Sequence, residues 1–260
     1  MLPTIDLAGL EVSRLIIGGN PFSGFSHQSR ERDEEMLDYY TTARLKETLD
    51  RAVAAGINTT IMRSDPHIHR LVREYRNDGG TIQWIAQVGA DSGTRTLPQA
   101  IDRAVAAGAN AAYIHGGQVD DAFADQDADT LTAWVERIRS HGIPAVCAGH
   151  HPDAHRWVDR LGIADFHAVA FYNCGSLHAG KGDKFQPDDP PRAVEAIQQI
   201  AKPCIGYKIM AAGRVDAREA LDFAFAHLKP TDAVNVGMHR GDNDRMVEDD
   251  AAMVAEILGG

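Results

Sequence analysis

Two stretches of the chain repeat one pattern: LDRAVAAGINTTIMRSD at Leu49–Asp65 and IDRAVAAGANAAYIHGG at Ile101–Gly117. Asp50–Asn58 aligns without a gap with the nine residues that begin at Asp102, and only the position of Ile57 differs. In each copy an amphipathic helical pattern ends at a Gly, which tolerates a left-handed turn, and a short β-rich run follows. A helix–Gly–strand unit repeated along a chain predicts a (β/α)8 barrel. Alanine-rich helices also resemble one another by chance, so the prediction depends on further copies.

The rest of the chain supplies those copies. Runs that predict strands cover residues 13–19, 58–62, 81–88, 111–115, 144–148, 166–172, 204–210 and 233–237, and a helical pattern follows each. The segment Ile5–Val12 is predicted to form a hairpin strand that covers the barrel floor. Residues 20–41 and 174–191 are predicted to be long loops over the catalytic face. We therefore predict the fold class α/β, a (β/α)8 TIM barrel, with residues 1–260 forming a single domain.

Composition restricts the function further. Of the 260 residues, 44% are hydrophobic and 24% charged, which is ordinary for a globular protein with a full core. The net charge of −11 disfavours a nucleic-acid partner. The sequence predicts no membrane span and no signal peptide. Cys147, Cys174 and Cys204 form no CxxC motif and predict buried thiols in a reducing, cytoplasmic compartment. A small-molecule substrate is expected, and a homo-oligomer is left open.

In a barrel, the residues just past the strand ends face one pocket. Seven of the twelve histidines fall there in this interpretation: 27, 67, 69, 115, 150, 151 and 239. Clustered imidazoles suit proton transfer near neutral pH or a divalent metal ion. The predicted catalytic residues are His115, Lys208, Asp65 and His150. The predicted substrate-binding residues are Asn20, Arg63, Gln87, Tyr172, Asn173, Arg214 and Arg240.

A metal site is predicted from the spacing Asp65-x-His67-x-His69. On an extended loop these side chains would point the same way, and His150 could complete a set for Zn or Mn. The alternative is that the histidines are exposed or cap helices. No glutamate of the kind found in metal-dependent sugar isomerases occurs at these strand ends, which weakens that comparison.

Lys208 is predicted to lie inside an apolar strand, and it must therefore point into the barrel or lose its solvation. A desolvated lysine could act as a base or as a Schiff-base nucleophile. An ion pair with Asp65 is the alternative. Arg214 and Arg240 occupy the usual phosphate-holding position of barrels, although arginines there are often merely solvated. The acidic runs at 120–129 and 248–250 are predicted to be solvated faces.

Five motifs together resemble the aldo-keto reductase superfamily: GLEVSRLIIGGNPFSG, AVAAGINTTIMRSD, AYIHGG, AFYNCGS and VNVGMHRGDNDRMVEDDAAM. The resemblance implies the barrel, the pocket location and an active-site His at His115. The family uses a catalytic Tyr, Lys, Asp and His. Ile61 stands where the Asp should be and Gln87 where the Lys should be, and no Tyr follows Asp65 at the expected place.

Three functions are consistent with the sequence. The favoured one is a non-redox enzyme acting on a small polar, sugar-like or carboxylated substrate by histidine acid–base or metal-assisted chemistry, as an isomerase, lyase or hydrolase. The second is an NADPH-dependent reductase that binds the cofactor through Lys208, Arg214 and Arg240 with His115 as proton donor. The third is a non-catalytic binding or sensor subunit, against which the clustered imidazoles and the two long loops argue.

Overall fold

The barrel is closed by eight parallel strands. The computed structural model of the chain describes residues 2–89, 96–174 and 183–259. The strands follow the order β10-β3-β4-β5-β6-β7-β8-β9 around the barrel. Their bounds are β3 Leu15–Gly18, β4 Thr59–Arg63, β5 Gln83–Val88, β6 Ala111–Ile114, β7 Ala145–Gly149, β8 Phe166–Ala170, β9 Cys204–Tyr207 and β10 Ala233–Gly237. The predicted (β/α)8 fold is confirmed.

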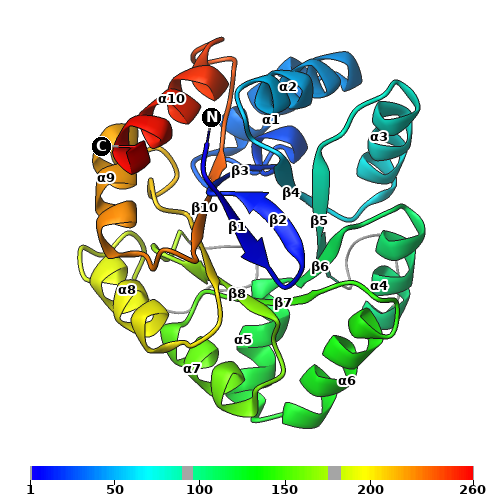
Figure 1. The fold of residues 1–260 in the computed structure, drawn as a ribbon, viewed down its shortest axis with the longest axis vertical. Coiled ribbons are helices and arrows are strands. Elements are labelled where there is room, and N and C mark those ends of the chain that lie inside the picture. The colour runs from blue at the N-terminus through cyan, green and yellow to red at the C-terminus, as the bar shows by residue number, and fades with distance from the viewer. Residues whose placement is uncertain (1, 90–95, 175–182, 260) are drawn as a thin grey trace.

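Helices surround the barrel as an outer ring (Figure 1). They are α1 Arg30–Tyr39, α2 Thr42–Ala54, α3 Pro66–Asn77, α4 Leu97–Ala106, α5 Gly116–Asp125, α6 Ala128–Arg139, α7 Pro152–Leu161, α8 Asp189–Gln199, α9 Ala217–His227 and α10 Met246–Gly259. Their apolar faces pack on the outward side chains of the strands and form the larger part of the core. In the described part of the chain, no helix combines the length and the apolar character that a membrane span requires.

The two repeated stretches form the same structure, α2–β4 and α4–β6. Gly56 and Gly108 end the two helices with φ of +92° and +94°, a region that favours glycine. The next residue closes the turn in each copy: the N–H of Ile57 donates to Ala52 at 2.8 Å, and that of Ala109 to Ala104 at 3.0 Å. The sequence repeat therefore encodes one helix-to-strand turn, used twice.

A two-stranded antiparallel hairpin, β1 Thr4–Leu7 and β2 Leu10–Ser13, covers one end of the barrel. It lies across the centre of the ring in Figure 1. Leu7 and Val12 are fully buried and join the side chains that fill the barrel interior, among them Ile16 and Phe166. The predicted floor segment is confirmed, and because the hairpin closes this end, the opposite, carboxyl end of the strands is left for a site.

Two segments that the sequence predicts to be a loop or a solvated face contain helices. The prediction of an irregular segment over 20–41 is wrong for α1, which begins after Ser29, whose side chain accepts from the N–H of Arg32 at 3.2 Å. The acidic run at 120–129, expected to be a solvated face, begins inside a helix as well, because α5 extends to Asp125. Part of the second predicted long loop, residues 175–182, lies outside the described residues.

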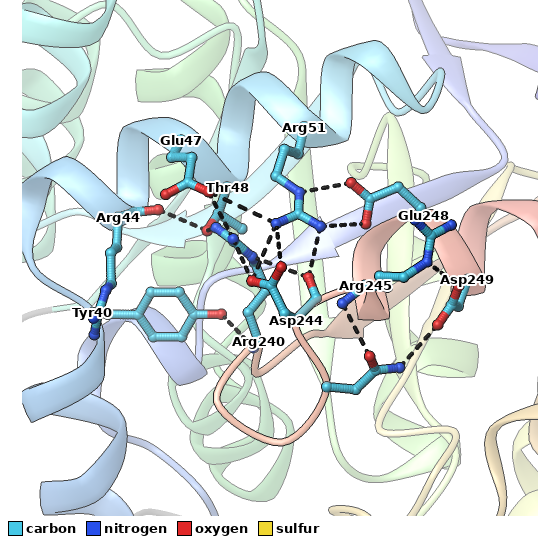
Figure 2. A network of polar contacts seen from close by, with 11 residues as sticks. Tyr40, Arg44, Glu47, Thr48, Arg51, Arg240, Asp244, Arg245, Glu248 and Asp249 are labelled. Carbon is cyan, nitrogen blue, oxygen red and sulfur yellow. Dashed lines mark hydrogen bonds and ion pairs between the residues drawn. The ribbon is translucent and has the colours of Figure 1, made fainter.

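A network of charged side chains joins the first and last units of the barrel (Figure 2). Arg51 of α2 pairs with Glu248 of α10 at 2.6 Å and with Asp244 at 3.1 Å. Arg240, which follows β10, pairs with Glu47 of α2 at 2.7 Å and with Asp244 at 2.6 Å. The network therefore holds α2 against the segment between β10 and α10.

Candidate active site at the carboxyl end of the barrel

A cavity of about 760 Å³ opens at the carboxyl ends of the strands. Its size is within the range of small-molecule sites. The sequence-predicted residues that line it are Asn20, Arg63, Gln87, His115, His150, Lys208 and Arg214. These side chains come from the ends of different strands and from the segments that follow them, and the barrel brings them to one place.

His150 is held by a carboxylate. It follows β7, and its Nδ1 lies 2.8 Å from Oδ2 of Asp120 on α5. The backbone N–H of His150 also donates to Asp120, at 3.1 Å. A carboxylate at Nδ1 favours the tautomer with the proton there, which leaves Nε2 able to accept a proton or a ligand. The Asp120–His150 pair is thus arranged for acid–base chemistry.

The lack of a side chain at Gly116 leaves room for the His150 ring. A Cβ at residue 116 would lie 2.7 Å from Cε1 of the His150 ring, which is closer than side chains normally approach. His115, one residue earlier, is the N-cap of α5, and its Nδ1 accepts the N–H of Gly117 at 3.2 Å. The ring centroids of His115 and His150 are 6.3 Å apart. The start of α5 thus brings two imidazoles together on the cavity wall.

Two tyrosines form the wall beneath these rings. Tyr207, the last residue of β9, lies 6.1 Å from the His150 ring and 6.4 Å from the Tyr113 ring, measured between centroids. The Tyr207 hydroxyl donates to the carbonyl of Gly149 at 3.1 Å. Burial raises the pKa of both phenols above the ordinary value. Both therefore remain protonated at neutral pH.

Lys208 follows Tyr207, and its position differs from the predicted one. It lies just past β9 rather than inside it, with φ of +57° in the left-handed region. Its Nζ is buried, has no hydrogen-bond partner among the described residues and lies 5.7 Å from the Tyr207 ring centroid. Burial lowers the pKa of Lys208 from its ordinary value, while Cys174 and Asp120 oppose the shift. The alternative, an ion pair with Asp65, does not form.

Two arginines of the cavity stack on aromatic rings. The guanidinium of Arg63 lies 4.5 Å from the Phe25 ring, and that of Arg214 lies 3.8 Å from the Phe185 ring, measured to the centroids. Such stacking fixes the plane of a guanidinium. Nε of Arg63 also lies 4.0 Å from Oδ2 of Asp65, and Nη1 of Arg214 donates to the carbonyl of Ala211 at 3.1 Å. Both arginines line the cavity and add positive charge to its wall.

The Asp65–His67–His69 set is not brought together. Asp65 is the N-cap of α3, where its Oδ1 accepts the N–H of Ile68 at 2.9 Å. His67 and His69 lie in the helix rather than on an extended loop, so two residues of separation turn them to different sides. His67 is exposed, and Nε2 of His69 lies 2.9 Å from Oγ of Ser64. The prediction that these residues and His150 share a metal is wrong, and Asp65 is outside the cavity as well. The Asp-Pro dipeptide, an N-cap followed by a proline, was the signal for the helix.

Three further predicted binding residues serve the fold instead. Arg240 is only 4% exposed and is consumed by the ion-pair network described above. Tyr172 packs on the core between the barrel and the helices. The backbone N–H of Asn173 donates to Asp189 at 3.0 Å, which places Asn173 in the structure of its own loop. None of these three lines the cavity.

Two carboxylates of the site, Asp120 and Asp250, lie in acidic runs that the sequence predicts to be solvated faces. Asp120 positions His150, and Asp250 of α10 is 5% exposed and lines the cavity. Burial, followed by the charge of Asp249, raises the pKa of Asp250 to about 7. The helical period could have indicated Asp250, because it lies three and four residues from the buried Val247 and Val254.

Comparison with known proteins supports the fold. No protein-family model matches the chain, and no curated protein matches it. Similar solved structures include a putative aldo-keto reductase from Pseudomonas aeruginosa, with TM-score 0.64, 18% identity and coverage of 98% of this chain and 94% of that one. An aldo-keto reductase from Bacillus halodurans has TM-score 0.61, 13% identity and coverage of 99% and 96%. A truncated 3-deoxy-D-arabino-heptulosonate 7-phosphate synthase from Thermotoga maritima has TM-score 0.60, 11% identity and coverage of 99% and 91%.

These neighbours confirm the resemblance to aldo-keto reductases at the level of the barrel. Ile61 and Gln87, which the sequence resemblance places at the family's Asp and Lys positions, both line the cavity. Arg240, expected to hold NADPH, is engaged elsewhere. The neighbours are enzymes of TIM-barrel families, both reductases and a synthase, and the likeness extends to the fold alone.

Proposed function

We propose that this protein is a non-redox enzyme that acts on a small polar carbonyl compound, of the lyase or isomerase type. The observation that carries the proposal is the buried Nζ of Lys208, which has no hydrogen-bond partner in the part of the chain that the structure describes. It lies in a cavity that is also lined by His150, the residue paired with Asp120. Lysines of lowered pKa serve as bases or Schiff-base nucleophiles because a neutral amine is populated closer to neutral pH.

In the proposed reaction the neutral Nζ adds to the substrate carbonyl carbon, and a C–N bond forms. The carbonyl oxygen takes up one proton from Nζ and one from solvent and leaves as water, giving a protonated imine. The imine withdraws electrons from the adjacent carbon, so that a proton or a carbon fragment can depart from it. Nε2 of His150, with Asp120 stabilising the charged ring, accepts and returns the proton. Hydrolysis of the imine then releases the product and restores Lys208.

The substrate is proposed to carry a carboxylate or phosphate group. Arg63 and Arg214 hold stacked guanidiniums on the cavity wall, and a planar guanidinium matches the geometry of a carboxylate or a phosphate. Asn20 and Gln87 add uncharged hydrogen-bonding groups suited to hydroxyls. A sugar-like or carboxylated compound matches this lining.

Imine trapping tests the proposal. The protein is incubated with pyruvate, glyceraldehyde or dihydroxyacetone phosphate and sodium cyanoborohydride, and the adduct is mapped by mass spectrometry. We expect one adduct per chain at Lys208, lost in Lys208→Arg and retained in Lys202→Arg, where an exposed lysine is changed. Labelling spread over surface lysines, unchanged in Lys208→Arg, would refute the nucleophilic role. NADPH oxidation with the same compounds, abolished by His115→Ala, would instead establish the reductase alternative.

A further inference from the structure

We propose a second site, for a divalent metal ion, at the rim of the cavity, formed by His239, Glu35 and Asp242. Glu35 lies on α1, and His239 and Asp242 lie in the segment between β10 and α10. One ligand atom from each residue can be chosen so that all three lie within 4.8 Å of one another. Separations of this size allow a single ion to contact all three with small side-chain adjustments.

His239 is the observation that points to a ligand. It is 3% exposed, yet neither ring nitrogen has a hydrogen-bond partner among the described residues. Its ring packs edge-on against Tyr39 and Tyr40, at 5.2 Å and 5.5 Å between centroids. Leaving a buried imidazole without partners is costly, and a metal–nitrogen bond would remove that cost.

The two carboxylates share one cation at present. Arg32 donates to Oε2 of Glu35 at 2.7 Å and to Oδ2 of Asp242. Two carboxylates and one guanidinium leave a net negative charge beside the neutral imidazole. Each of these ion pairs uses one oxygen of its carboxylate, and the second oxygen remains for another cation. Arg32 therefore preorganises the carboxylates and also competes with a metal ion for their charge.

The donor set indicates the class of metal. One imidazole and two carboxylates suit Zn²⁺ or Mn²⁺ better than Ca²⁺, which takes six or more oxygen ligands, or Cu⁺, which prefers thiolates. His239 and Asp242 also line the cavity. A metal ion held there would face a bound substrate, and it could polarise or orient an oxygen of that substrate.

Metal titration of the full chain tests the site. After treatment with a chelator and its removal, Zn²⁺ and Mn²⁺ are titrated by calorimetry, and Co²⁺ binding is followed by its visible absorption. We expect one equivalent to bind, and His239→Ala and Glu35→Gln to weaken the affinity by at least about tenfold. Arg32→Met should tighten it, because the competing charge is gone. Glu34→Gln changes the adjacent exposed glutamate and should leave the affinity as it is.

The outcomes separate cleanly. Equal affinities in the wild type, Glu35→Gln and His239→Ala, or no saturable binding to the wild type, would overturn the site. If His239→Ala fails to fold, Glu35→Gln decides, because Glu35 is exposed and its replacement leaves the core unchanged. Imine trapping at Lys208 requires no metal, so the failure of one proposal does not imply the failure of the other.

Discussion

Asp120 is a single residue on which several features of the cavity depend. It bonds to the ring and the backbone of His150, and its charge raises the pKa of Lys208, opposing the effect of burial. One carboxylate thus orients the imidazole and partly offsets the effect of burial on the pKa of the amine. Because Asp120 comes from α5 and the other two follow β7 and β9, the coupling depends on the barrel geometry.

Asp120→Asn should lower the pKa of Lys208 further below its ordinary value. Removing the negative charge of Asp120 disfavours the protonated amine, so the pKa of Lys208 falls. Reductive ¹³C-methylation followed by NMR titration would measure the change directly. Asp121→Asn, which alters the exposed neighbour on the same helix, is the matched control. An unchanged or raised Lys208 pKa in Asp120→Asn would contradict the coupling.

The helix-to-strand turn predicts a stability effect at the level of the repeated element. Gly56→Ala and Gly108→Ala should each destabilise the fold by about 1–2 kcal/mol, because both positions have φ near +90°. Gly108→Ala should cost more, since its Cβ would lie 2.0 Å from Nη1 of Arg76, whereas at Gly56 nothing lies closer than 3.4 Å. Urea unfolding measures both. Gly259→Ala, at a position with nothing within 4 Å, should have little effect.

The floor hairpin can be tested in the same way. Leu7→Ala removes a fully buried side chain from the end of the barrel interior, so we expect a loss of about 2–5 kcal/mol in unfolding free energy. Leu10→Ala, at a partly buried position of the same hairpin, should cost clearly less. Equal losses at the two positions would mean that the hairpin does not seal the interior.

Elements with strong apolar periodicity could be predicted, and polar helices could not. The predicted strand 233–237 has the same bounds as β10, because the polar segments on either side of this β-rich run mark where the strand begins and ends. Helix α1 buries only Met36, so its sequence lacks an apolar stripe. Helix α5 starts with two glycines and contains three aspartates, a composition typical of loops, and tertiary contacts override that preference.

At the scale of the molecule, Asp250 should make stability depend on pH. Its folded pKa of about 7 lies above the unfolded value, so its contribution to stability is present at low pH and is lost as the pH rises through about 4 to 7. Asp250→Asn should therefore gain stability relative to the wild type between pH 5 and pH 8, by up to about 2–3 kcal/mol. Urea unfolding at both pH values checks this, with exposed Asp125→Asn as control. A gain that is the same at both pH values would show that Asp250 is not neutral in the fold at pH 5.

The candidate site was predictable where strand ends alone place a residue. His115 and His150 follow β6 and β7 almost directly, and the barrel rule brings them together, whereas Lys208 was expected inside its strand and lies just past β9. Partners from helices, such as Asp120 and Asp250, depend on packing that no strand pattern encodes. Arg240 also follows a strand closely, yet it pairs with Glu47 of α2 instead of lining the cavity. The sequence does not indicate which of these two roles an arginine at this position takes.

The closure of the barrel has a consequence for how the chain is made. β3 forms parallel pairs with β10, Leu15 opposite Val234, and Arg51 finds Glu248 only after nearly the whole chain has been synthesised. Each intermediate strand can pair with its predecessor as it leaves the ribosome, but β3 keeps one edge open until the last unit arrives. An unpaired edge of buried residues such as Ile16 and Ile17 invites pairing with other chains. The interval between the synthesis of β3 and that of β10 is therefore when this protein is most exposed to aggregation and most in need of a chaperone.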